Sequence, residues 1–526
     1  MRLCWMTVAA LLSLGCSLFS LPATPAPALA PLGATATAAA LPATPTRPAP
    51  PADFEATPQA DWTDDQPQRL PLRDALEDDA ADFPAATRYW IQATVALDPS
   101  GPSAILEGVA RIRFTSPLVQ PLDDLVLMLW ANDAQYAAVM TAGPALIDGQ
   151  VVNPEPLSNG LGLRFRLTVP LAPGAALDVT LPFRVVSSAA IRPTAPGRFG
   201  FAEGVFIAPT FYPLVPRLSP DGEWQTQAAP PGGDTTNSDI AFYDVRLTVP
   251  GETEVAATGS ELERLSNADG TVTVRFASGP VRDFAFALGP LRQAETTAGD
   301  IVVRAWVLEE HAEAARATAR VAARAVQVFE GLLGPYPYDE LDVLDSPGAF
   351  GGIEYPALVY IGVIGEPGDD LVIVHEVAHQ WFYALIGNDQ LDEPWLDEAA
   401  ASYAEVLYLE AIGEPQAATG LLDQFRLILR ATGEAATPIG LPISAYASES
   451  DYGVFVYLKG ALFFDALRSR LGEAAFLAFL RAYDARHRYG FATSASFQET
   501  AEAACACDLN DLFDLWVYEG GDLMLP

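Results

Sequence analysis

The chain has 526 residues, half of them apolar, and 67 acidic against 30 basic residues give it a formal net charge of −37 at pH 7. Such a length exceeds that of one ordinary domain and predicts two or three domains with sizeable buried cores. The negative charge repels nucleic-acid phosphates and anionic lipid headgroups, which argues against a role in binding nucleic acid.

The first 20 residues are typical of a secretory signal sequence. Arg2 provides a short basic start, and an apolar run follows that is too short for a comfortable membrane span. Cys16 follows Leu-Gly, an order that resembles a bacterial lipoprotein cleavage box whose cysteine is lipidated. The alternative is simple cleavage further on, after Ala28 or Ala30. Both predict an extracytoplasmic protein, either secreted or held at the membrane surface through a lipidated Cys16.

Residues 21–85 predict a tether, first rich in alanine and proline and then acidic, without the apolar pattern of a folded unit. Only two cysteines follow it, Cys505 and Cys507. This Cys-x-Cys pair forms either a small disulfide or a reduced pair in a helix, and it has too few partners nearby for a metal site.

Residues 86–296 predict a β-rich N-terminal domain. Short alternating runs such as LRFRLTVPL and AFYDVRLTVPG recur at regular intervals and are separated by glycine, proline, asparagine and aspartate. A period of two in runs of this length is typical of an antiparallel, all-β domain. No cluster of residues in it has the character of a catalytic site.

The period changes near His311, where an alanine-rich helical pattern begins that ends at Gly334-Pro335. Helical patterns dominate from there to the end, apart from the strand-like runs LDVLDS and ALVYIGVI. Residues 297–526 therefore predict a second domain of α+β class that is mainly helical.

A metal-binding pattern lies in this second domain, within LVIVHEVAHQWFYALIG. His375 and His379 are four residues apart, so on a helix both imidazoles face the same side and can bind one ion. Two imidazoles suit Zn²⁺, which in catalytic sites uses three protein ligands and keeps one position for water. Glu376 lies beside the first ligand, where it can take a proton from that water. A pair of buried structural histidines is the weaker alternative.

The third ligand is expected on the next predicted helix, EPWLDEAAASYAEVLYLEAIG, which a short loop would place antiparallel to the first. Glu398 is one candidate for the carboxylate. Glu393, Asp397 and Glu405 compete with it on charge alone, and periodicity does not choose between them.

The combined pattern HEVAHQWF…PWLDEAAASYAE resembles the aminopeptidase-N-like family of gluzincin zinc peptidases, whose signature is HExxH, eighteen residues, and then glutamate. Eighteen residues separate His379 from Glu398 (398 − 379 − 1), so the resemblance selects Glu398 as the third ligand. It implies one Zn²⁺ ion per chain and a thermolysin-like catalytic domain preceded by a β-rich domain. It is strong over residues 330–470 and weak before residue 240.

Two further segments share this resemblance. GGIEYP at 351–356 is similar to the family's G-x-M-E-N motif, which implies that Glu354, with Gly351 and Gly352, binds the free α-amino group of a substrate. Taken alone, this segment is more typical of a glycine-rich turn with a solvated glutamate. VYLKG at 456–460 is similar to the family's Y-x-K-G segment, which implies that Tyr457 donates a hydrogen bond to the reaction's oxyanion. Tyr452 is the alternative for that role.

The resemblance therefore implies a zinc-dependent aminopeptidase that acts on peptides with a free N-terminus. The β-rich domain has no recognisable counterpart of the family segment that supplies a second acidic anchor for the amine. Two rival functions stay open on the sequence: an endopeptidase with the same metal site, and a non-catalytic surface-binding protein on a peptidase scaffold.

Overall fold

A computed structural model describes the residues 62, 66–98, 103–136, 138–187, 198–230, 233, 238–347, 351–366, 368–433 and 436–521. The predicted signal sequence at 1–20, the lipidation site at Cys16 and nearly all of the tether up to residue 65 lie outside these residues.

The β-rich part is built around a nine-stranded sheet in the order β14-β15-β12-β1-β2-β9-β5-β6, with β4 also paired to β9. Its side chains alternate between buried and accessible, as along β9, where Leu177, Val179 and Leu181 face inward. One pair departs from the antiparallel arrangement that the sequence predicts: β1 and β12 are parallel. These strands lie far apart in the chain, so no hairpin turn forces them to run in opposite directions. The strands are β1 (Thr87–Leu97), β2 (Ala104–Thr115), β4 (Ala138–Ala142), β5 (Ala145–Ile147), β6 (Gln150–Val152), β9 (Ala176–Ser187), β12 (Ala241–Pro250), β14 (Ser260–Ser266) and β15 (Thr271–Val281).

Two smaller antiparallel sheets complete this part. The first has three strands, which are β3 (Leu122–Met128), β8 (Gly162–Leu171) and β7 (Glu155–Pro156). The second has four, which are β10 (Gly200–Ala202), β11 (Val205–Pro209), β16 (Ala285–Gly289) and β13 (Glu254–Ala257). The short loop between β15 and β16, which carries Arg282 and Asp283, links the large sheet to the four-stranded one.

A mixed five-stranded sheet begins the second half of the chain, in the order β17-β18-β19-β21-β20. The strands are β17 (Arg292–Ala298), β18 (Ile301–Val307), β19 (Glu340–Asp345), β20 (Gly352–Ile353) and β21 (Leu358–Ile361). The predicted boundary at 296/297 falls inside β17, which pairs with β18 along its whole length. The sequence could not show this, because the β17–β18 hairpin alternates just as the preceding strands do.

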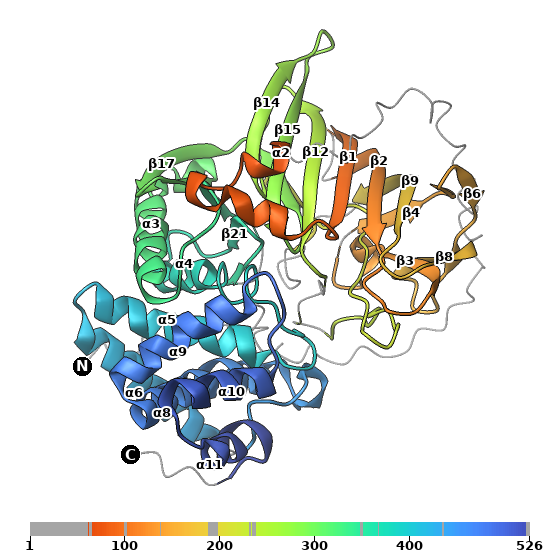
Figure 1. Cartoon of the computed structure of the whole chain (residues 1–526). Coiled ribbons are helices and arrows are strands. Elements are labelled where there is room, and N and C mark those ends of the chain that lie inside the picture. Colours follow the sequence, from red (N-terminus) through yellow and green to blue (C-terminus); the bar gives the residue numbers. More distant parts are fainter. Residues whose placement is uncertain are drawn as a thin grey trace, which may run out of the picture.

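Helices make up most of the remainder (Figure 1). They are α3 (Ala315–Leu332), α4 (Asp369–Ala378), α5 (Trp395–Ala411), α6 (Pro415–Thr432), α7 (Glu449–Tyr452), the π-helix η5 (Gly453–Lys459), α8 (Gly460–Leu471), α9 (Glu473–His487), α10 (Ser494–Cys505), α11 (Asn510–Phe513) and the π-helix η6 (Asp514–Tyr518). Short 3₁₀ turns lie at η2 (Trp130–Asn132), η3 (Glu309–His311) and η4 (Ile443–Ala445). None of the helices in the described part combines the length and apolar character that a membrane span needs. Cys505 and Cys507, at the end of α10, form a disulfide, which decides between the two alternatives for this pair.

The tether prediction is wrong for its last part, because the chain from residue 66 onward packs against the folded body. Helix α2 (Gln66–Arg69) and the 3₁₀ helix η1 (Asp74–Asp82) flank Leu72, which is 3% exposed and bridges to Tyr338. Arg73 donates to the carbonyl of Tyr336 at 2.9 Å. This acidic segment is held by few apolar residues and one arginine. Because it contains so few apolar residues, its composition is that of an exposed linker.

Candidate metal centre

Helix α4 carries the two histidines. It begins after Gly368, whose φ of +99° suits glycine, and Asp369 and Asp370 lie in its first turn, where carboxylates interact favourably with the helix dipole. Every residue from 372 to 378 is buried, so the helix lies inside the protein. His375 and His379 project from one face of this helical segment, as their spacing predicts.

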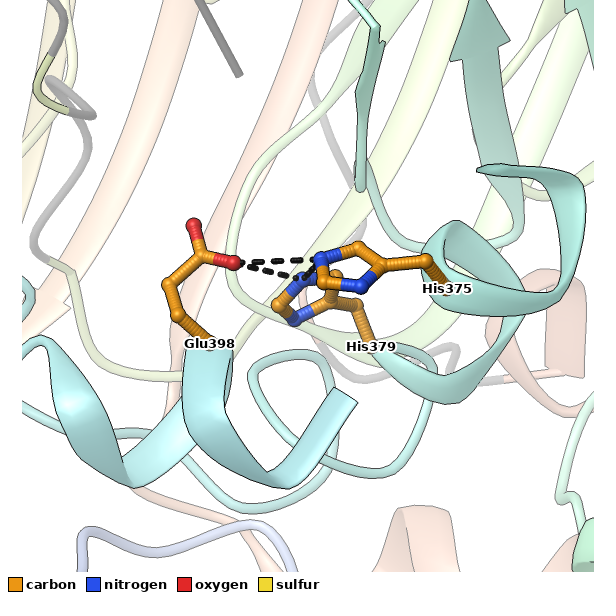
Figure 2. A group of neighbouring side chains, drawn as sticks. All are labelled: His375, His379 and Glu398. Atoms are coloured by element: carbon orange, nitrogen blue, oxygen red, sulfur yellow. Dashed lines mark hydrogen bonds and ion pairs between the residues drawn. The ribbon is translucent and has the colours of Figure 1, made fainter. Parts of the chain in front are cut away.

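Glu398 completes a cluster of three donor atoms (Figure 2). Its Oε2 lies 3.2 Å from Nε2 of His375 and 3.2 Å from Nε2 of His379, and the two nitrogens are 3.2 Å apart. The three side chains are at most 3% exposed. Two imidazole nitrogens and one carboxylate oxygen that converge on one point are the donor set of a catalytic zinc site, and three protein ligands leave a coordination position for water. The residues therefore fit Zn²⁺.

Acceptors behind the histidines fix their orientation. Nδ1 of His375 lies 3.0 Å from Oε1 of Glu405, and Nδ1 of His379 lies 2.8 Å from the carbonyl oxygen of Phe382. Both partners are acceptors, so each Nδ1 donates its proton to them, and in the neutral imidazole the lone pair of each Nε2 faces the cluster. Such outer hydrogen bonds hold a ligand's tautomer and ring orientation.

The electrostatics of the protein groups alone show how strongly the cluster is coupled. Burial acts to lower the pKa of His375, but its hydrogen bonds to Glu398 and Glu405 outweigh this and raise the pKa to about 9. Burial acts to raise the pKa of Glu398, but the charge of His379 and the hydrogen bond from His375 lower it well below the usual range. A zinc ion held by these residues would take the place of protons on the imidazoles, so its affinity would fall as the pH falls.

The structure separates Glu398 from the three acidic residues that compete with it on sequence. Glu393 accepts a hydrogen bond from the backbone N–H of Ser494 at 2.8 Å, away from the histidines. Asp397 accepts from the side chain of Gln390, and Glu405 lies behind His375. Periodicity could not make this distinction, because it depends on the path of the loop between α4 and α5.

Glu376 lies next to the first ligand and is 1% exposed. It packs directly against the short strand β20: a Cβ atom added at Gly352 would lie 2.3 Å from Oε1 of Glu376. Gly351 is also buried here, and its carbonyl accepts from the N–H of Gly362. Gly352 thus lets the edge of the five-stranded sheet approach the metal helix closely.

Glu354, which follows β20, is 2% exposed and lies beside the metal ligands. A carboxylate oxygen of Glu354, a ring nitrogen of His379 and a carboxylate oxygen of Asp397 all lie within 4.8 Å of one another. The side-chain amide of Gln390 joins the two acids, donating to Glu354 at 3.1 Å and to Asp397 at 3.2 Å. The structure thus brings the predicted amine-binding residue to the metal centre.

Tyr457 reaches the cluster from the π-helix η5. Its hydroxyl donates to Oε1 of Glu398 at 2.6 Å, and its ring stacks on His375 with centroids 5.8 Å apart. Gly460 permits this approach, since a Cβ atom there would lie 2.3 Å from Cβ of Ala399, the residue after Glu398. Tyr452 packs edge-on against the ring of Tyr457, with ring centroids 5.6 Å apart.

Two glutamines at the site were missed from the sequence. Gln380 accepts from the N–H of Ala357 at 2.8 Å and donates to the carbonyl of Tyr355 at 3.2 Å, so it ties the metal helix to the segment of Glu354. Gln390 lies in the loop before α5. Adjacency to His379 could have indicated Gln380, but no local pattern singles out Gln390.

Comparisons with known proteins agree with this geometry. The model of the peptidase family M1 domain matches residues 369–516. Aminopeptidase M1 of Arabidopsis thaliana is 28% identical over 243 residues, covering 43% of this chain and 28% of the relative. Human aminopeptidase B is 34% identical over 170 residues, covering 29% of this chain and 26% of the relative. The chain thus spans less than a third of the length of these two relatives.

Solved structures give the same fold over most of the chain. The M1 zinc metallopeptidase from Deinococcus radiodurans superposes with a TM-score of 0.62 at 22% identity, over 84% of this chain and 94% of that one. A mutant of that protein bound to a Tyr-Ser-Ala substrate gives 0.62 at 21% identity, over 84% and 95%. The prediction of a β-rich domain followed by a mainly helical one is confirmed.

With two histidines from one helix and a glutamate from the next as its metal ligands, the site is that of the gluzincin class. Within that class, the match to the peptidase family M1 domain and the similarity to aminopeptidases support the resemblance to the aminopeptidase-N-like family that the sequence predicts.

Proposed function

We propose that this protein is a zinc-dependent aminopeptidase that releases residues from the N-terminus of peptides. The observation that carries the proposal is the position of Glu354, whose carboxylate lies within 4.8 Å of a ring nitrogen of the metal ligand His379. A buried carboxylate at this distance can hold the α-ammonium group of a substrate while the first peptide bond lies at the metal.

Each step of the reaction falls to a residue in place around the cluster. Glu354 binds the ammonium group and so selects a free N-terminus. Glu376 accepts a proton from the attacking water and passes it to the leaving amine. Tyr457 turns its hydroxyl from Glu398 to the tetrahedral oxyanion and stabilises the negative charge there. Zn²⁺ held by His375, His379 and Glu398 supplies Lewis acidity toward the water and the carbonyl.

The test of exopeptidase action is Glu354→Ala. We expect hydrolysis of a free peptide to fall by about 10²-fold or more, because the ammonium loses its charged partner and the peptide bond is no longer held in place. The measurement compares kcat/KM on a peptide with a free N-terminus and on the same peptide acetylated, for both proteins. Glu393→Ala is a matched control, since its carboxylate binds Ser494 instead.

Efficient cleavage of the acetylated peptide by the wild-type protein, unchanged in Glu354→Ala, would favour the endopeptidase. A zinc-loaded protein that cleaves neither peptide would favour a surface-binding protein on a peptidase scaffold.

We also propose that the protein works outside the cytoplasm, as a secreted protein or a surface lipoprotein. The basic start and apolar run of residues 1–20, with Cys16 after Leu-Gly, support this. The mass of the mature N-terminus distinguishes the two routes. A lipidated chain would begin at Cys16 and lose its acyl mass in Cys16→Ser, whereas a secreted chain would begin further on. A mature protein that retains Met1 and residues 1–20 would contradict both.

A further inference from the structure

A buried arginine from the β-rich part reaches the turn that follows the metal helix. Arg282, in the loop between β15 and β16, is 2% exposed. Its Nε donates to the carbonyl of Tyr383 at 2.7 Å, and its Nη2 donates to the carbonyls of Leu385, at 3.4 Å, and of Gly490. A single guanidinium therefore holds two carbonyls of the turn at 383–387.

The turn is shaped around this arginine. A Cβ atom added at Gly387 would lie 2.3 Å from Cζ of Arg282, so the backbone passes too close to the guanidinium for any residue with a side chain. Tyr383 has a φ of +133°, which is rare for a residue with a side chain and persists only where neighbours impose it. The neighbours here are Arg282, at the Tyr383 carbonyl, and Asp283, whose carboxylate accepts a hydrogen bond from the Tyr383 hydroxyl.

The same turn is in direct contact with a metal ligand. The N–H of Ala384 donates to the carbonyl of His379 at 3.0 Å. The carbonyl of Phe382, one residue before Tyr383, accepts the hydrogen bond from Nδ1 of His379 at 2.8 Å. Any movement of the Tyr383 peptide therefore moves the group that fixes the tautomer and orientation of His379.

Arg282 keeps its charge in this environment. Burial lowers its pKa to about 10, so the guanidinium is still protonated at neutral pH and its N–H groups all remain donors. A lysine at this position would offer one ammonium group in place of the planar guanidinium that now donates to several carbonyls. Lysine and arginine are therefore not equivalent here.

We infer that Arg282 and Asp283 are positioning residues for His379, through which the β-rich part of the chain sets the metal affinity of the helical part. The inference rests on the proposed zinc centre but concerns residues outside it.

The test measures zinc affinity directly, so it does not depend on turnover. Full-length wild-type protein, Arg282→Lys and Tyr383→Phe, which removes the hydrogen bond to Asp283, are titrated with zinc against a chromophoric chelator, well below their unfolding temperatures. The absorption spectrum of Co²⁺ in each protein reports ligand geometry. We expect affinity to fall by about tenfold in Arg282→Lys and by less in Tyr383→Phe, with a changed Co²⁺ spectrum, because lost outer-shell partners typically cost 10–100-fold in metal affinity.

Arg217→Lys is the matched control. The guanidinium carbon of Arg217 lies 3.6 Å from the centroid of the Phe491 ring, which Arg282 also stacks on at 4.4 Å. Arg217 therefore contacts the same ring as Arg282. Its ion pair, however, is with Asp239, 4.0 Å away in the β-rich part. This variant should bind zinc like the wild-type protein.

Zinc affinity and Co²⁺ spectra equal to wild type in both Arg282→Lys and Tyr383→Phe would overturn the inference. If Arg282→Lys does not fold, the milder Tyr383→Phe decides by itself, since it removes only one hydroxyl. A wild-type protein that binds no zinc would instead refute the proposed function, so the two failures are distinguishable.

Discussion

Replacing Glu376 with glutamine is expected to remove nearly all peptide hydrolysis while the protein still binds zinc. Glutamine has the same shape, so it can keep the packing against Gly352 and leave His375 undisturbed. It has no basic oxygen that could accept the proton from water, and loss of a general base typically costs about 10²–10⁴-fold in rate. Turnover of a free peptide and bound zinc are measured on the same preparation.

Because glutamine and glutamate have nearly the same shape, a loss of activity in this variant reports on the carboxylate itself. A Glu376→Gln protein with wild-type turnover would rule out Glu376 as the base. If Glu376→Gln loses zinc as well as activity, loss of the base and loss of the metal must be separated. Glu376→Asp does this, because it keeps a carboxylate and shortens only the side chain.

Glu398→Ala is expected to have the second large effect, the loss of the metal itself. The change removes one of three protein ligands and leaves Nε2 of both histidines without the carboxylate oxygen that now lies 3.2 Å from each. Zinc affinity should fall by more than the roughly 10–100-fold that an outer hydrogen bond contributes, and hydrolysis should fall with it. Competition with a chelator gives the affinity.

Two comparisons make the Glu398 result specific. Glu393→Ala, five residues earlier on the same segment, removes a partly buried hydrogen bond to Ser494 but no ligand, so its zinc affinity should match wild type. Excess zinc should restore part of the activity of Glu398→Ala. Full zinc occupancy of Glu398→Ala at ordinary zinc concentrations would mean that another carboxylate completes the site.

The parts of this site that were predictable are those set by local geometry. The i,i+4 spacing of His375 and His379 needs only a helix to bring both imidazoles together. Glu398 required the resemblance to a known family, because the loop between α4 and α5 places it, and loop paths do not follow from periodicity. Many strands and some helices were predictable for the same reason, because burial follows the period of the element, as along β9 and α6. Helices α4 and α5 are instead buried along most of their length.

The features that could not be predicted depend on contacts between residues far apart in the chain. Arg282 and Tyr383 are 101 residues apart, and nothing near either one indicates the other. The hydrogen bonds of Gln390 depend on how its loop folds over Glu354. The boundary before β17 and the attachment of residues 66–82 were misjudged because local composition does not report which sheet or surface a segment joins.

The attachment of residues 66–82 has a mechanical consequence. Helix α2 packs on β12 and β15 of the large sheet, whereas Arg73 binds Tyr336 and the hydroxyl of Tyr489 donates to Asp79, so this strap is fastened to both halves of the molecule. If the chain before it is anchored to a surface, tension enters the fold through the strap. The load is then shared between the two halves, whereas a linker joined to one half alone would load only that half.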